Sequence, residues 1–229
     1  MNRIIYIADP EILAIPVQEC NEAFIDVKEK TEILYGPIPE CEATKDCYTK
    51  MRTTVFQKLC AAQKDLPHGW RFRLYEGFRS LAVQQMLFDY EYARVKQRIP
   101  NADPKEIFHE TTRLVSPVIN VDGSKNVPPH NTGAAVDVEI INADGKLVDM
   151  GMIVAETWNV DPEICMTECT SISDTARQNR KILYDVMYAH DFINYPTEWW
   201  HFSYGDRYWA YHKKQAHAIY GSADQLLVV

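Results

Sequence analysis

Apolar and polar positions alternate along two short stretches of the chain, one near residue 72 and one near residue 138. A period of two places successive side chains on opposite faces of a strand, so each stretch predicts a strand, and the first is expected to be half-buried. In the second stretch the apolar residues face one way, while Asp137 and Glu139 face the other. With two shorter candidates added, the predicted strands cover residues 70–75, 136–141, 146–150 and 192–195.

Apolar positions three and four residues apart predict amphipathic helices between these strands. The clearest helix has Ser80 as its N-cap and Pro100 just past its end, and another is capped by Ser173 or Asp174. The predicted helices cover residues 51–64, 81–98, 105–115, 174–190 and 206–219. Segments without a clear period are predicted to be irregular, and these are 31–50, 116–129 and 157–172.

Helices and strands follow one another without the regular alternation that a parallel sheet requires. We therefore predict an α+β fold with a small antiparallel sheet flanked by helices. The 229 residues suit one domain covering residues 1–229. A hydrophobic fraction of 46% and a charged fraction of 24% are typical of a globular chain.

The charge and composition of the chain limit the classes of partner and the cellular location that we expect. The formal net charge is -8 and the basic residues are scattered, which argues against a nucleic-acid-binding protein. No apolar stretch reaches the length of a membrane span, and the N-terminal apolar run is too short for a signal peptide, so we expect a cytoplasmic protein. The six cysteines form no CxxC pair and are expected to be reduced, with a Cys41–Cys47 disulfide as the alternative.

Two segments carry candidate chemistry. In the first, His130 precedes a turn at Gly133 that lets it approach Asp137 on the predicted strand. In the second, Glu198 and His201 flank two tryptophans. Apolar side chains that exclude water from a carboxylate raise its pKa toward the range of a general base. Together the segments supply enough groups for a catalytic zinc, which needs three protein ligands and an open position.

A third segment places Arg79 between the end of a predicted strand and the start of a helix. From there its guanidinium could stabilise an oxyanion or bind a carboxylate. The HExxH pattern of thermolysin-like enzymes is absent, because His109-Glu110 is followed by Thr-Thr-Arg. The histidines outside these segments are interpreted as ordinary polar residues, namely His68, His109, His190, His212 and His217.

Taken together, the motifs resemble the D-alanyl-D-alanine dipeptidases, which belong with the zinc D,D-carboxypeptidases. The matching elements occur in family order over roughly residues 50–210. They are Glu76-Gly77-Phe78-Arg79-Ser80, His130-x-x-Gly133-x-Ala135-x-Asp137, Met150-Gly151, Arg177-Gln178-Asn179-Arg180 and Phe192-Ile193-Asn194-Tyr195-Pro196-Thr197-Glu198-Trp199-Trp200-His201. One departure is Pro128, where the family usually has Ser.

The resemblance implies a zinc D,D-peptidase (Hedgehog/D,D-peptidase-like) fold that holds one zinc ion on His130, Asp137 and His201. It also implies Glu198 as the catalytic base and Arg79 as the group that stabilises the oxyanion. The implied reaction is hydrolysis of a small D,D-dipeptide, D-Ala-D-Ala, to two D-alanines.

The implied pocket is small and walled by Trp199 and Trp200. An acidic residue after the Met-Gly pair is implied to bind the substrate ammonium group. Ungapped alignment puts Ala155 in that place, so Glu156 and Asp149 are both candidates.

Two alternatives stay open. One is a D,D-carboxypeptidase acting on longer cell-wall peptides, and the other is a non-catalytic zinc-binding domain that binds cell-wall fragments. Oligomeric state is not predicted.

Overall fold

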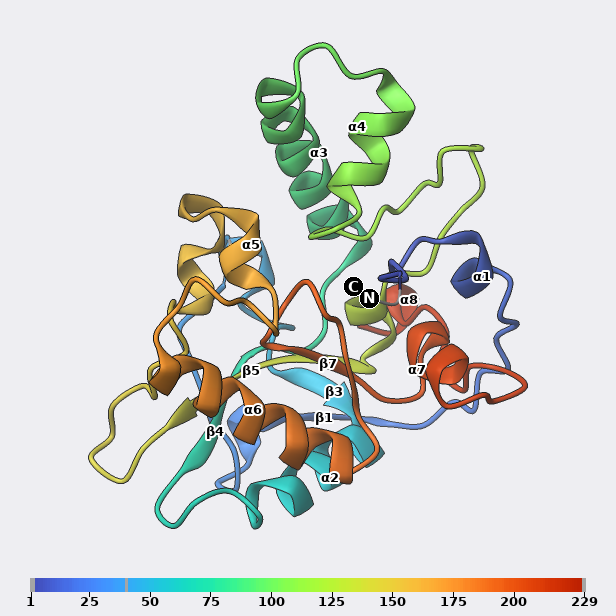
Figure 1. Cartoon of the computed structure of the whole chain (residues 1–229). Helices are drawn as coiled ribbons and strands as arrows, with labels where there is room; N and C mark the ends of the chain where they lie inside the picture. The colour runs from blue at the N-terminus through green and yellow to red at the C-terminus, as the bar shows by residue number, and fades with distance from the viewer. Residues whose placement is uncertain (1–2, 40, 228–229) are drawn as a thin grey trace.

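The computed structural model describes residues 3–39 and 41–227 and contains two sheets (Figure 1). The predicted domain limits, 1–229, include residues 1–2, 40 and 228–229, which lie outside the described part. The strands are β1 (Phe24–Asp26), β2 (Leu34–Tyr35), β3 (Lys50–Arg52), β4 (Arg71–Glu76), β5 (Ala135–Ile141), β6 (Ile193–Asn194) and β7 (His201–Ser203).

The larger sheet has the order β2-β4-β5-β7-β6, and β1 pairs with β3 in a separate two-stranded sheet. Strands β4, β5, β7 and β6 pair in antiparallel fashion, as the sequence predicts, whereas the two-residue β2 lies parallel to β4. Residues 146–150 do not form a continuous strand, but their first part pairs back on β5: Leu147 bridges to Ile141, and Val148 N donates to the carbonyl of Ile140 at 2.8 Å. The α+β fold class is confirmed.

The predicted helices are present, but those predicted over 51–64, 105–115 and 206–219 are each at least three residues shorter than expected, and Met51 and Arg52 belong to β3 instead. The α-helices are α1 (Pro10–Leu13), α2 (Thr53–Gln63), α3 (Leu81–Arg98), α4 (Pro104–Thr111), α5 (Pro162–Cys165), α6 (Asp174–Ala189), α7 (Arg207–His212) and α8 (Asp224–Leu227). Ser80 and Ser173 accept backbone N–H bonds at the starts of α3 and α6, as predicted for N-caps. The prediction of a helix over 206–219 is wrong beyond His212, because the chain reverses at Lys214, where φ is 54°.

Short 3-10 helices fill several gaps, including part of the segment predicted to be irregular after residue 157. They are η1 (Val27–Glu29), η2 (Glu42–Thr44), η3 (Pro129–Thr132) and η4 (Val154–Asn159). Helix α5 lies in the same predicted loop, so that segment is more ordered than its sequence indicates.

The main core lies between one face of the large sheet and the helices α2 and α6, which lie together across that face in Figure 1. Val136, Val138 and Ile140 of β5 enter this core, so the predicted alternation is confirmed. Asp137 and Glu139 point to the opposite face and are also buried. A strand with polar residues buried on its second face needs a covering layer that satisfies them.

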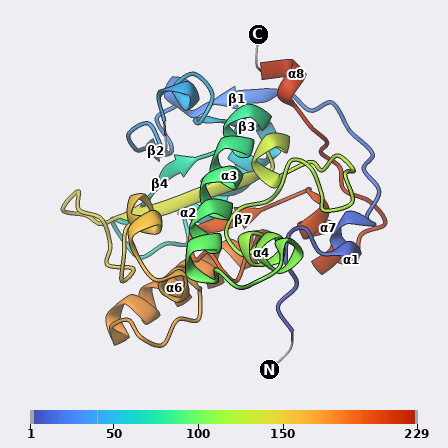
Figure 2. The same ribbon diagram turned by 90° about the horizontal axis from the view of Figure 1, so that it is seen from above.

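That second face lies towards α3 and α4, a helical hairpin that projects from the body (Figures 1 and 2). The hairpin has a small apolar cluster of its own, formed by Val83, Leu87, Phe88 and Val115. None of the helices in the described part of the chain combines the length and apolar character that a bilayer crossing needs.

Candidate metal centre

Three side chains from separate elements converge on one point of the polar face. His130 comes from η3, Asp137 from β5 and His201 from the first position of β7. Asp137 and His201 are direct partners in the antiparallel β5–β7 register, so the sheet itself sets their spacing. All three side chains are buried, and each presents one potential ligand atom to the others within 4.8 Å.

The distances fit a tetrahedral zinc site. His201 Nδ1 lies 3.0 Å from Asp137 Oδ1 and 3.1 Å from His130 Nε2, and His130 Nε2 lies 3.3 Å from Asp137 Oδ1. Ligands held at about 2.0–2.1 Å in a tetrahedron stand about 3.3 Å from one another. The donor set of two imidazoles and one carboxylate is also typical of catalytic zinc.

A backbone carbonyl fixes the orientation of His130. Its Nδ1 lies 2.7 Å from the carbonyl oxygen of Gly77 and donates to it, which leaves Nε2 as the metal-facing atom. Gly77 must be glycine, because a Cβ there would stand 2.5 Å from the carbonyl oxygen of Lys50. At the other end of the His130 turn, Gly133 has φ 71°, as predicted for the turn that brings His130 towards Asp137.

Asp137 is held in its charged form. Burial raises the pKa of this carboxyl, but the charges and hydrogen bonds of His130 and His201 outweigh burial and hold the pKa well below its ordinary value. An aspartate binds a metal ion in its deprotonated form, so this environment suits Asp137 as a ligand.

Glu198 lies beside the three ligands in the turn that leads into β7. Its Oε2 is 3.6 Å from His201 Nδ1, and its side chain is buried. The neighbouring tryptophans differ in position: Trp200 lines the pocket, whereas Trp199 packs edge-on against Trp200 and lies under the guanidinium of Arg180. The prediction that both tryptophans wall the pocket is therefore wrong for Trp199.

Arg79 lines the same pocket and is held by two buried side chains. Its guanidinium is paired with Glu76, and its Nη1 donates to Gln84 Oε1 at 3.1 Å. A β-bulge in β4 makes this possible, because the extra residue lets Glu76 stand opposite Asp137 while Tyr75 lines the pocket. Gln84 was not predicted as a site residue, although it is a polar residue on the mostly apolar buried stripe of α3.

The pocket is a cavity of about 50 Å³ that all three metal-facing side chains and Glu198 line. Further polar groups on its wall are Ser116 and Thr157, and Trp158 contributes an aromatic side. Glu156 and Asp149, the two ammonium-binding candidates, are exposed and not among the lining residues. Asp149 instead accepts from the backbone N–H of Gly151 at 2.8 Å.

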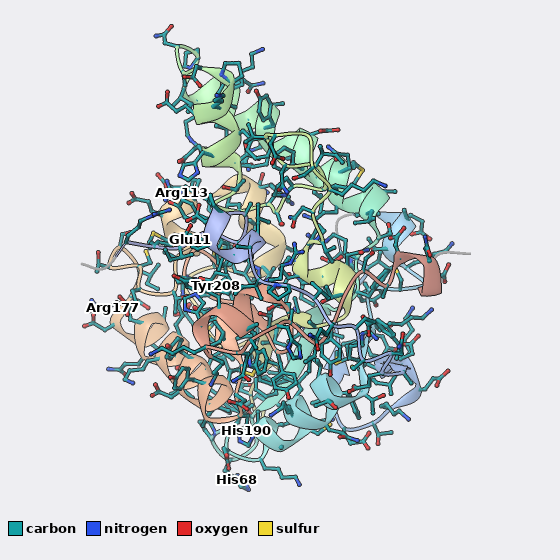
Figure 3. The ribbon with its side chains drawn as sticks, turned by 90° about the vertical axis from the view of Figure 1, so that its right-hand side faces the viewer. Glu11, His68, Arg113, Arg177, His190 and Tyr208 are labelled. Carbon is teal, nitrogen blue, oxygen red and sulfur yellow. The ribbon has the colours of Figure 1, made fainter. Side chains whose placement is uncertain are left out.

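The histidines predicted to be ordinary polar residues lie away from this point. His68 and His190 lie at the end of the molecule opposite the α3–α4 hairpin (Figure 3). His190 Nε2 is 2.7 Å from Asp65 Oδ2, and His109 stacks edge-on against Tyr6. In the described residues, His130, Asp137 and His201 are the group of His, Cys, Asp and Glu that could hold a metal ion.

The cysteines are free thiols in the part of the chain that the structure describes, as predicted. Cys41 and Cys47 are unpaired, so the alternative disulfide is not formed.

The fold and the site are those of a metallopeptidase: a three-ligand cluster, a buried carboxylate beside it, and a small pocket. The family model described as "D-ala-D-ala dipeptidase" matches residues 41–219, and the chain belongs to this family. The cofactor is therefore a zinc ion, which the His/Asp/His group fits.

A D-alanyl-D-alanine dipeptidase of Synechocystis sp. is 28% identical over 226 residues, which is 90% of this chain and 91% of the relative. Two solved structures show more distant similarity. VanYB in complex with D-Alanine-D-Alanine is 14% identical over 90% of this chain and 94% of its own, with a TM-score of 0.42. The LdcB LD-carboxypeptidase is 15% identical over 86% of this chain and 76% of its own, also with a TM-score of 0.42.

Proposed function

We propose that this chain hydrolyses D-alanyl-D-alanine to two D-alanines in a zinc-dependent reaction. The observation that carries the proposal is the convergence of His130, Asp137 and His201 at tetrahedral spacing with Glu198 directly beside them. Membership of the dipeptidase family gives the substrate class.

In the proposed mechanism the three ligands hold zinc, which when bound lowers the pKa of water and polarises a carbonyl. Glu198 accepts a proton from the attacking water and passes it to the nitrogen of the leaving D-alanine. Arg79, fixed by Glu76 and Gln84, donates to the oxyanion of the tetrahedral intermediate. Trp200 excludes bulk water from one side of the reacting groups.

The size of the pocket favours a short substrate. The cavity has a volume of about 50 Å³ and is lined by Tyr75, Trp158 and Trp200. Such a pocket suits a small peptide better than a long cell-wall strand.

For the substrate ammonium group we propose Glu156 rather than Asp149. Glu156 lies on η4, between pocket-lining Val154 and Thr157, and its exposed carboxylate lies 3.5 Å from the backbone N–H of Ile153. A cytoplasmic location and a role in the turnover of cell-wall peptides stay predictions.

The test is release of free D-alanine by the purified protein, with and without a zinc chelator. The substrates are D-Ala-D-Ala, L-Ala-L-Ala and a pentapeptide ending in D-Ala-D-Ala. Chelator-sensitive release from the D,D-dipeptide alone supports the proposal. Release from the pentapeptide alone would assign the D,D-carboxypeptidase reaction instead, and no release with zinc bound would leave a binding function.

A further inference from the structure

The turn between β6 and β7, residues 195–200, carries Glu198 and delivers His201 to the metal centre. Three backbone hydrogen bonds lie within the turn and its ends. Tyr195 N donates to the carbonyl of His201 at 3.0 Å, Glu198 N donates to the carbonyl of Tyr195 at 2.9 Å, and His201 N donates to the carbonyl of Glu198 at 3.1 Å. A turn of this kind, with two bulky tryptophans between the functional residues, needs support from outside to hold one shape.

That support comes from the side chain of Asn194, the last residue of β6. Its Nδ2 donates to the carbonyl oxygen of Glu198 at 3.0 Å and to the carbonyl oxygen of His201 at 3.0 Å. The residue is buried, with 7% of its surface exposed, so water does not compete freely for these bonds. One amide group thus ties together the backbone of the predicted base and that of the predicted third ligand.

A second residue orients this amide. Thr167 Oγ1 donates to Asn194 Oδ1 at 2.6 Å, and the backbone N–H of Thr167 donates to the carbonyl of Pro196 at 3.0 Å. Just before it, the carbonyl of Cys165 accepts from Trp199 N at 2.9 Å. The segment 165–167 therefore lies against the turn and makes three bonds with it or with its support.

We propose that Asn194 is a positioning residue that sets the distance between the base Glu198 and the metal ligand His201, with Thr167 fixing its orientation. The inference rests on the proposed function. An asparagine suits the position because it offers two N–H donors on one side and an acceptor on the other. Outer groups of this kind orient metal ligands, and their loss costs about 10- to 100-fold in metal affinity or activity.

Asn194→Asp tests the role with a side chain of the same shape. It replaces the two donors with an oxygen that faces two carbonyl oxygens, so the turn is pushed open while the volume is kept. We expect kcat to fall by about 10- to 100-fold and zinc affinity to weaken, with KM little changed. Zinc affinity is measured by competition with a chelator, and the absorption spectrum of the cobalt-substituted protein reports ligand geometry independently of turnover.

A second pair of variants covers the case in which Asn194→Asp folds poorly. Thr167→Val removes the hydroxyl donor at nearly constant volume and should cost about fivefold in kcat, whereas Thr167→Ser keeps the donor and should behave as the unmodified protein. Thr111→Val is the matched control, because it removes a buried hydroxyl bond of 2.7 Å to the carbonyl of Ile107 in α4. It should change the melting temperature without changing kcat.

Unchanged kcat and zinc affinity in Asn194→Asp, or equal kcat losses in Thr167→Val and Thr111→Val, would overturn the inference. Failure of the proposed function would give a different result: the unmodified protein itself would release no D-alanine or bind no zinc. The inference about Asn194 would then fail together with the proposed function.

Discussion

Replacing Gly77 by alanine tests whether the backbone around the metal centre is as closely packed as the geometry indicates. The new Cβ would stand 2.5 Å from the carbonyl oxygen of Lys50 and 3.2 Å from that of Tyr48. Both contacts are with backbone, so neither can be relieved by a side-chain rotation. The same segments are joined by hydrogen bonds from Gly77 N to the carbonyl of Tyr48 and from Phe78 N to the carbonyl of Lys50.

The size of the effect follows from these distances. Opening the Lys50 contact to 3.0 Å requires a displacement of about 0.5 Å. If the Gly77 carbonyl moves by the same amount, its 2.7 Å contact with His130 Nδ1 lengthens to about 3.2 Å, the limit of a good N–H···O bond. Overpacking of this kind costs about 1–3 kcal/mol. For a chain of this size each kcal/mol lowers the melting temperature by about 2–4 °C.

The assay combines thermal unfolding with zinc affinity measured by chelator competition. Gly77→Ala should lower the melting temperature and weaken zinc binding by about 10- to 100-fold, because the carbonyl that orients His130 is displaced. Gly36→Ala is the control, since its added Cβ meets its nearest atoms at 3.6 Å, an ordinary contact. A Gly77→Ala protein that melts and binds zinc as the unmodified protein does would refute the reasoning.

Four further outcomes are expected. Glu198→Gln should keep its zinc and lose about 10²- to 10⁴-fold in kcat, because a base is removed and no ligand is; loss of zinc on metal analysis would instead make Glu198 a ligand. His201→Ala should lose both zinc and activity, and a full equivalent of bound zinc would remove His201 from the ligand set. Chelation of the unmodified protein should lower its melting temperature, because zinc binds the folded state, and an unchanged melting curve would contradict this. Burial raises the pKa of the Cys165 thiol to about 12, so its reactive thiolate form should stay negligible until the pH approaches that value. When the native protein is treated with iodoacetamide at about pH 8, mass spectrometry should detect alkylation of exposed Cys20 and not of buried Cys165. Equal alkylation of the two residues would contradict the structure.

The elements that were predicted well are those with strong local signals. The helix from Leu81 to Arg98 has the predicted bounds, because Ser80 caps its start and Pro100 follows its end. The strand around Val138 was found through its alternation. By contrast, β1, β2, β3 and β7 have two or three residues each, too few for a periodic pattern, and partners distant in the chain hold them in place.

The site residues that belong to sequence motifs were predicted, and those that depend on contacts between segments were not. His130, Asp137, Glu198 and His201 were identified from their motifs, and the structure brings them together. The substrate-binding candidates were placed by their distance from a Met-Gly pair alone. A position count gives no information on which way a side chain turns on η4, and Glu156 faces solvent there. The support from Asn194 depends on contacts between segments, which no single-segment pattern contains.

The pairing of Asp137 with His201 across β5 and β7 has a consequence for how the chain acquires its metal. A slip of one residue between two strands turns every side chain of one of them to the other face. In such a misregistered molecule the carboxylate and the imidazole would lie on opposite sides of the sheet and could not share an ion. Only chains in which β5 and β7 have paired in the correct register can therefore bind zinc at this site. The zinc content of a refolded sample measures the fraction of such molecules.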